Sequence, residues 1–171
     1  MISAVMVTRF SVFDSTVLLK GLAYDIAASL REAQVYSLSA FGSTSDTNQF
    51  DSPYGMSFTP STKEYYFFRY DGSGYPEYTI GSITNLDVFT IGRNMEIYDV
   101  CVRMVGETTD DCTIDRLDIS FKRPEFQALF NAPGVTSSNI EYGIVKVKSP
   151  NGDDIWTITV SLLGQISVVL E

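Results

Sequence analysis

The sequence contains no histidine, and it has only two cysteines among its 171 residues. Without histidine, the commonest general base and the commonest zinc ligand are missing. The chain also lacks a G-x-S-x-G motif, a P-loop, a G-x-G-x-x-G motif and a Ser-x-x-Lys sequence. Asp115 and Asp118 lie three positions apart on an expected strand, so they form a poor acid pair. These absences predict that the protein is not an enzyme.

Positive charge is also scarce, with 12 Lys and Arg against 21 Asp and Glu and a formal net charge of −9. Proteins bind nucleic acid through cationic contacts to phosphate, so we expect no nucleic-acid partner. No run of residues reaches the roughly 20 apolar positions needed to span a bilayer. We expect the chain as given to be soluble and to form one domain over residues 1–171.

Apolar residues at steps of three and four predict a long helix at the N-terminus. Asp14 and Ser15 are suitable N-cap residues, and Gly42 is a suitable C-terminal stop. Residues 1–13 keep a helical spacing, so the predicted helix covers 1–41. One apolar stripe runs along it, made of Leu19, Leu22, Ala23, Ile26, Leu30 and Ala33.

In residues 42–171 the helical period of apolar residues no longer holds, and the pattern predicts strands and turns. Strands are expected within 54–60, 64–70, 87–91, 95–105, 113–123 and 140–149, one or two strands within 155–170 with Gly164 between them, and an irregular excursion at 123–139. A helix followed by a meander predicts an α+β fold, with the long N-terminal helix packed across an antiparallel sheet.

The stretch "LAYDIAASLREAQVYSLSA" (22–40) resembles the end of the first helix in type IV pilin-like proteins, above all minor pilins and type II secretion pseudopilins. "LDISFKRP" (117–124), "SPNGDDIWTITVS" (149–161) and "GQISV" (164–168) are similar to the last strands of such heads. The family begins with a leader and about 20 apolar residues. Here "MISAVMVTRF" resembles the middle of that first helix. We therefore expect Met1 to replace or follow the hydrophobic first half of the helix, which has been removed.

The resemblance implies a pilin-like fold and a structural subunit of a type IV pilus or pseudopilus-like filament, which assembles through the N-terminal helix carrying Leu19 to Ala33. Its partners would be other pilin or pseudopilin subunits, and the inner membrane through a hydrophobic segment absent here. The protein would be extracytoplasmic, anchored in the inner membrane before assembly and at the cell surface afterwards. Because the assembling segment is absent, we expect this chain to be monomeric.

Two other functions stay open at this point. One is a minor pilin at a filament tip that binds DNA or a surface, which predicts a local basic or aromatic patch on the loops. The other is an unrelated secreted enzyme or carbohydrate-binding domain, which the aromatic content of 13% allows.

Cys101 and Cys112 lie at the two ends of an expected hairpin, where a disulfide can form. An extracytoplasmic location would permit that bond. Two separate thiols and a redox pair are the alternatives, although no Cys-x-x-Cys spacing favours redox chemistry.

No cofactor is expected, and calcium is the one open metal. Asp71, Ser73 and Glu77 offer oxygens at alternate positions of a Gly-rich turn, like part of a calcium loop. A second acidic group, made of Glu107, Asp110 and Asp111, lies in another turn. We expect both groups to be ordinary surface turns.

Overall fold

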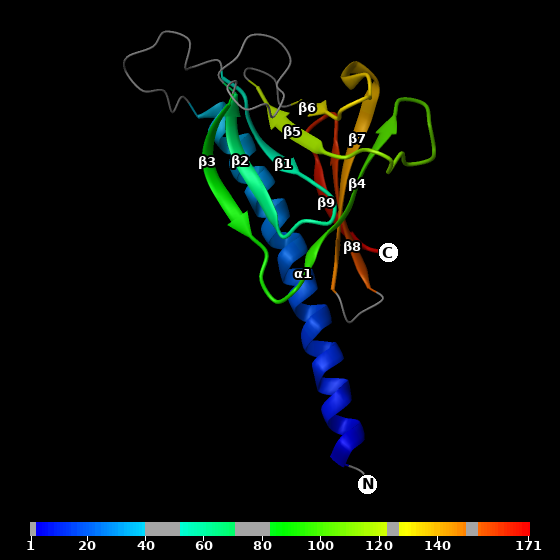
Figure 1. Ribbon diagram of the computed structural model, residues 1–171. Helices are drawn as coiled ribbons and strands as arrows, with labels where there is room; N and C mark the ends of the chain where they lie inside the picture. The colour runs from blue at the N-terminus through cyan, green and yellow to red at the C-terminus, as the bar shows by residue number, and fades with distance from the viewer. Residues whose placement is uncertain (1–2, 40–51, 71–82, 123–126, 150–153) are drawn as a thin grey trace.

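A computed structural model of the chain describes residues 3–39, 52–70, 83–122, 127–149 and 154–171 (Figure 1). Within these residues there is one α-helix, α1, which spans Ser3–Leu38. The strands are β1 Tyr54–Phe58, β2 Glu64–Tyr70, β3 Ile83–Thr90, β4 Glu96–Met104, β5 Leu117–Phe121, β6 Ala128–Asn131, β7 Ile140–Lys148, β8 Ile155–Ser161 and β9 Ile166–Leu170, and one turn of 3₁₀-helix, η2, covers Ser137–Asn139.

The strands form two sheets with antiparallel pairing throughout. The first sheet has the order β3-β2-β1-β5-β6 and the second the order β4-β7-β8-β9. In β7, Val145 and Val147 belong to the core cluster, whereas Lys146 points to the other face and pairs with Glu171. This is the period of two that a half-buried strand requires.

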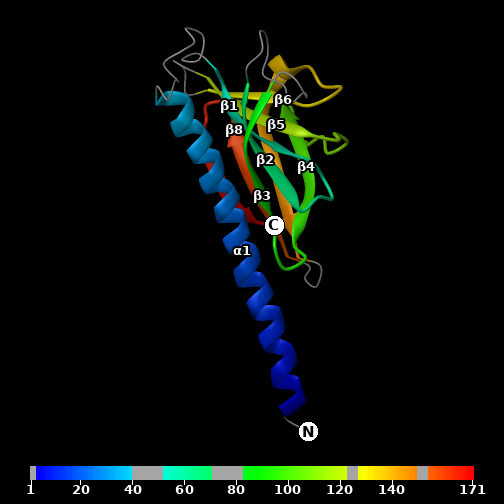
Figure 2. The ribbon, with the colours of Figure 1, turned by 60° about the vertical axis from the view of Figure 1, so that its left-hand side comes forward.

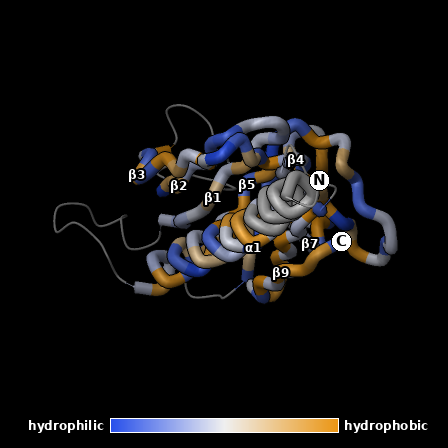
Figure 3. The backbone as a smooth tube through the Cα atoms, turned by 90° about the horizontal axis from the view of Figure 1, so that it is seen from below, coloured by the Kyte–Doolittle hydropathy of each residue, from blue (hydrophilic) through white to orange (hydrophobic). Residues whose placement is uncertain are grey.

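The helix lies along the junction of the two sheets. It contacts β1 and β5 of the first sheet and β7, β8 and β9 of the second. Figure 3 views the molecule from below and shows β1 and β5 to one side of α1 and β7 and β9 to the other. Apolar side chains from both sheets and from α1 form one core cluster. Toward its N-terminus, α1 runs past the sheets (Figures 1 and 2).

The expected fold class, α+β with a long helix packed across one antiparallel sheet, is wrong. Strands in two sheets make the described chain mostly β, with one α-helix as the minority. The helical period of residues 1–41 led to an overestimate of the share of the fold that the helix makes up. The residues that fill the core come mainly from the strands. Alternation within a strand also does not reveal its pairing partner, so a single meander could not be distinguished from two sheets.

The elements differ from the sequence prediction at several places. The helix ends at Leu38 instead of residue 41, and Gly42 lies outside the described residues. Strand β3 begins at Ile83 instead of residue 87. The excursion predicted at 123–139 contains β6, which pairs with β5 through Phe130 opposite Ile119. A strand of four residues is too short to show a clear period.

Candidate interaction surface

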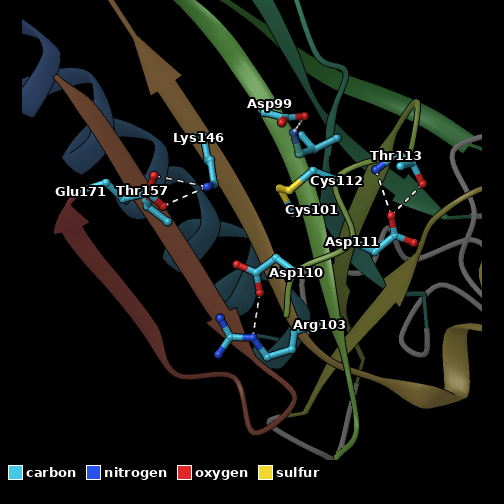
Figure 4. The surroundings of a disulfide bond; sticks show 11 residues. Asp99, Cys101, Arg103, Asp110, Asp111, Cys112, Thr113, Lys146, Thr157 and Glu171 are labelled. Carbon is cyan, nitrogen blue, oxygen red and sulfur yellow. Dashed lines mark hydrogen bonds and ion pairs between the residues drawn. A yellow bond between two sulfur atoms is a disulfide. The ribbon is translucent and has the colours of Figure 1, made fainter. Parts of the chain in front are cut away.

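The structure joins Cys101 and Cys112 in a disulfide, the pairing that the sequence favoured (Figure 4). Their Cα atoms lie 4.1 Å apart, because Val102 and Asp111 form an antiparallel bridge beside them. The Asp99 carboxylate lies near both sulfur atoms. Among the described residues, Asp99 and the two cysteines form the one cluster of acidic and cysteine side chains close enough together to hold a metal ion. Disulfide sulfurs offer no thiolate for a metal, so this group is not a metal site.

The acidic turn beside the disulfide is occupied by its own contacts. Asp110 accepts a hydrogen bond of 2.7 Å from Nε of Arg103. Asp111 accepts bonds from the hydroxyl and the backbone N–H of Thr113, at 2.6 and 2.9 Å, and these lower the pKa of Asp111. Glu107 lies in the preceding turn. The contacts are those of a surface turn and not of a calcium loop.

The other calcium candidates, Asp71, Ser73 and Glu77, lie outside the described residues.

A buried carboxylate lies in the first sheet. Asp118 is fully buried and accepts hydrogen bonds from Ser57 at 2.7 Å and from Asn131 at 2.9 Å. Nε of Arg116 lies 3.2 Å from the same carboxylate. The pairing of β1, β5 and β6 places Ser57, Asp118 and Asn131 in one row across the sheet. Buried charge is tolerated where it is paired and hydrogen-bonded, so this network has a structural explanation.

The predicted apolar stripe of α1 faces the head. Within it, Leu19, Ala23, Ile26, Leu30 and Ala33 are 0% exposed, and Leu22 is partly buried against the core. We call these six residues the inward stripe. The protein's own sheets cover five of them fully and Leu22 in part, so the stripe holds α1 to the head.

A second stripe lies on the opposite side of α1, and the sequence reading missed it. Val17, Tyr24 and Val35 are 52%, 51% and 61% exposed. Gly21 and Ala28 lie between them and are exposed as well. The steps of four, three, four and seven residues keep these positions on one helical face. We call these five residues the outward stripe.

Charged residues border the outward stripe on both sides, with a different sign on each. Lys20 and Arg31 form the basic flank and are exposed. Asp25 and Glu32 form the acidic flank and are exposed too. Nζ of Lys20 lies over the rings of Tyr24 and Trp156, 5.9 and 5.7 Å from their centroids, so the basic flank lies beside β8. A helix with 3.6 residues per turn places the two pairs on opposite sides of the stripe.

The acidic flank borders a groove of about 650 Å³ between α1, β3 and the turn that leads to β4. Its apolar lining includes Leu22, Phe89 and Met95, and its charged lining is Asp25, Glu32 and Arg93. On its floor, the hydroxyls of Tyr65 and Ser29 lie 3.4 Å apart. Burial raises the pKa of Tyr65. The groove therefore combines apolar side chains with two carboxylates and one guanidinium.

Comparisons of the chain with protein-family models, with curated proteins and with solved structures found no match.

Within the described part of the chain, no helix combines the length and the apolar character needed to cross a membrane.

Proposed function

We propose that this protein is a structural subunit of a type IV pilus or pseudopilus-like filament and assembles with other such subunits through α1. The observation that carries the proposal is the outward stripe. Val17, Tyr24 and Val35 expose apolar side chains along one face of a helix whose other face is already packed. An amphipathic helix needs one apolar face to fold, so a second one marks an interaction surface.

The course of α1 supports the same function. The helix continues past the sheets toward its N-terminus, where the head does not cover it (Figure 2). In the sequence, the spacing of the outward stripe continues at positions 13, 10 and 6, which are Phe, Phe and Met. The resemblance of residues 22–40 to the first helix of pilin-like proteins points to the same use of this element.

An extracytoplasmic location belongs to this proposal. The disulfide between Cys101 and Cys112 is a bond that oxidising compartments permit and the cytoplasm disfavours. In the proposed route, the inner membrane holds the subunit before assembly, and the filament carries it to the cell surface afterwards.

The test is to insert an epitope tag into the protein's own gene in the organism that makes it, so that the whole gene product carries the tag, and to shear the filaments from the cells. We expect the tag in the sheared fraction and, by immunogold electron microscopy, along the filaments. Tagged chain confined to the unsheared cell and absent from every filament would contradict the proposal.

A matched pair of variants makes this test specific to α1. Val17→Asp with Val35→Asp places charge on the outward stripe and should abolish incorporation without lowering the amount of folded protein. The control is Val105→Asp, because Val105 is 63% exposed and lies outside α1. The control should enter filaments as the parent chain does.

A further inference from the structure

We propose that the groove between α1 and β3 binds an extended, cationic segment of a partner protein, with basic side chains at every third position. The inference goes beyond the proposed function, because this partner is not a filament subunit. It is argued from the floor of the groove, its charges, its apolar walls and its length.

The floor of the groove holds an oxygen atom that lacks a hydrogen-bond donor. Ser29 and Tyr65 are buried, with 8% and 4% of their surface exposed. The hydroxyl of Ser29 donates to the carbonyl of Asp25 at 3.0 Å, so Tyr65 is the donor in the 3.4 Å contact between the two hydroxyls. Among the described residues, no N–H or O–H group donates to the Tyr65 oxygen. Buried acceptors are normally paired, so this atom favours a ligand that brings an N–H donor.

The charges around this oxygen favour a cation. Asp25 and Glu32 line the helix side of the groove. Burial is the largest cause of the raised pKa of Tyr65, and the negative charges of Asp25 and Asp87 raise that pKa further. Within the described part of the chain, Arg93 is the one cation that lines the groove, so carboxylates outnumber it. The ammonium of lysine and the guanidinium of arginine supply both the charge and the N–H donors.

The walls of the groove suit the aliphatic part of such side chains. Leu18 and Leu22 line the helix side, and Phe89, Ile91 and Met95 line the opposite side. Lysine and arginine pack their methylene groups on apolar surface while the charged end stays in a polar environment. An inorganic cation would leave these walls unused, so the groove fits an amphipathic cation.

The length of the groove and the spacing of its carboxylates indicate an extended chain. The lining runs from Val17 to Glu32, or about 22 Å along α1, which exceeds the reach of one side chain. Asp25 and Glu32 are seven residues apart, or about 10 Å along the helix axis. Side chains on one face of a polyproline II helix recur about every 9 Å, and those on one face of a β-strand about every 7 Å. The polyproline II repeat, every third residue, therefore matches the two carboxylates better.

The edge of β3 does not favour a segment that pairs as an added strand. Strand β3 is the edge of the first sheet. The Asp87 carboxylate accepts a hydrogen bond of 2.8 Å from the backbone N–H of Val88, and the pairing with β2 shifts register between Phe67 and Phe68. Charged side chains and bulges at an edge strand hinder the pairing of another chain. The segment therefore binds through its side chains and does not extend the sheet.

The experiment measures the binding of fluorescent peptides to the full chain by anisotropy. The probe is a short capped peptide with lysine at every third position and proline or leucine between. The control peptide has the same composition with its lysines adjacent. General attraction to a protein with a net charge of −9 would bind both peptides alike, whereas the groove should bind the probe several times more tightly.

Matched variants locate the contact. Asp25→Asn with Glu32→Gln removes both carboxylates and should weaken probe binding by about tenfold, as expected for the loss of two exposed ion pairs. Glu107→Gln with Asp115→Asn makes the same change of charge outside the groove lining and should bind the probe as the parent does. Tyr65→Phe keeps the ring, removes the unused oxygen and should weaken binding by a smaller factor. Far-UV circular dichroism checks that the variants fold, as expected for exposed or isosteric changes.

Three results would overturn the inference. Equal binding of the two peptides, or an equal loss in the groove variant and its control, would mean that the protein attracts cations in general. Competition by spermidine as strong as that by unlabelled probe would assign the groove to a small amine and reject the protein segment. The filament test is separate, because probe binding by a chain absent from every filament would reject the filament and keep the groove.

Discussion

Tyr65 shows how the packing of α1 changes the chemistry of a single residue. Its ring stacks between Phe58 and Phe89, and its hydroxyl lies 3.4 Å from that of Ser29 on α1. Burial is the largest cause of its raised pKa, and the hydrogen bond with Ser29 opposes the shift in part. The folded state therefore keeps the phenol proton at a pH where the unfolded chain has lost it.

This shift predicts a specific loss of stability in alkali. The contribution of Tyr65 is complete below its unfolded pKa of 10.0 and is lost as the pH rises through the higher folded pKa. Tyr65→Phe removes the ionising group, so its free energy of unfolding should fall less steeply above pH 10 than that of the parent. Urea unfolding across that range measures it. Tyr98→Phe, at a ring that is 42% exposed, is the control and should follow the parent.

Two glycines should respond in opposite ways to alanine. A Cβ atom at Gly55 would lie 2.5 Å from the carbonyl oxygen of Ile119, where β1 meets β5. Gly55→Ala should therefore destabilise the fold by about 1–3 kcal/mol, the usual cost of overpacking. Gly21 has no heavy atom within 4 Å of that position, so Gly21→Ala should stabilise α1 by about 1 kcal/mol. Urea unfolding of both variants measures the two shifts, and equal shifts would contradict this structure.

Some residues of the site follow from local sequence and others do not. The apolar period of the inward stripe and the placement of the two cysteines at the ends of a hairpin are local signals, so the sequence could show both. The assembly role expected for the stripe does not fit its burial against the protein's own sheets. The partners of Asp118 were not predictable, because Ser57 lies 61 positions away in the chain. Only the register of β1 on β5 brings these two side chains together.

At the scale of elements, the two faces of α1 should differ in their effect on stability. Leu30 is fully buried, and Leu30→Ala should cost about 2–5 kcal/mol because it opens a cavity in the core. Val35 is 61% exposed, and Val35→Ala should change stability by no more than about 0.5 kcal/mol. Thermal and urea unfolding measure both. A comparable loss for the two variants would mean that the outward stripe is also packed.

The disulfide should stabilise the turn between β4 and β5. Its two cysteines are separated by 11 positions, and closing a loop of that size is worth about 3 kcal/mol in the chain-entropy model. The double variant Cys101→Ser, Cys112→Ser should lose about that amount in urea unfolding under non-reducing conditions. The parent treated with a reductant should lose the same amount, and a double variant as stable as the oxidised parent would refute this account.

The period of the sequence predicted the elements better than their arrangement. A helical period of more than thirty residues predicted α1, and alternation predicted most strands, because both signals are local. The fold class was wrong because pairing is not local. Strand β4 pairs with β7 across more than thirty intervening residues, and no pattern in either strand indicates the other.

At the scale of the whole molecule, the net charge of −9 should keep free copies apart. We therefore expect a monomer of 19.0 kDa by sedimentation velocity at micromolar concentration. A dimer at that concentration would contradict this expectation.

The candidate surface was less predictable than the fold. Val17, Tyr24 and Val35 could be read as ordinary residues of an amphipathic helix until the covered face was known. A second apolar spacing is present in the sequence, but only the position of the sheets identifies which of the two stripes is exposed. The filament function remains a prediction drawn from the resemblance and from this surface.

The lengthwise course of α1 along the head also determines how the protein responds to force. A pull on the N-terminal end acts parallel to the row of buried contacts from Leu19 to Ala33, so it shears them together instead of peeling them one after another. Near the N-terminal end of this row, Thr16 donates a 2.8 Å hydrogen bond to Asp154, and this bond bears part of the load. The disulfide links β4 to the turn that follows it, outside this path, so reducing it should leave the rupture force of the helix unchanged.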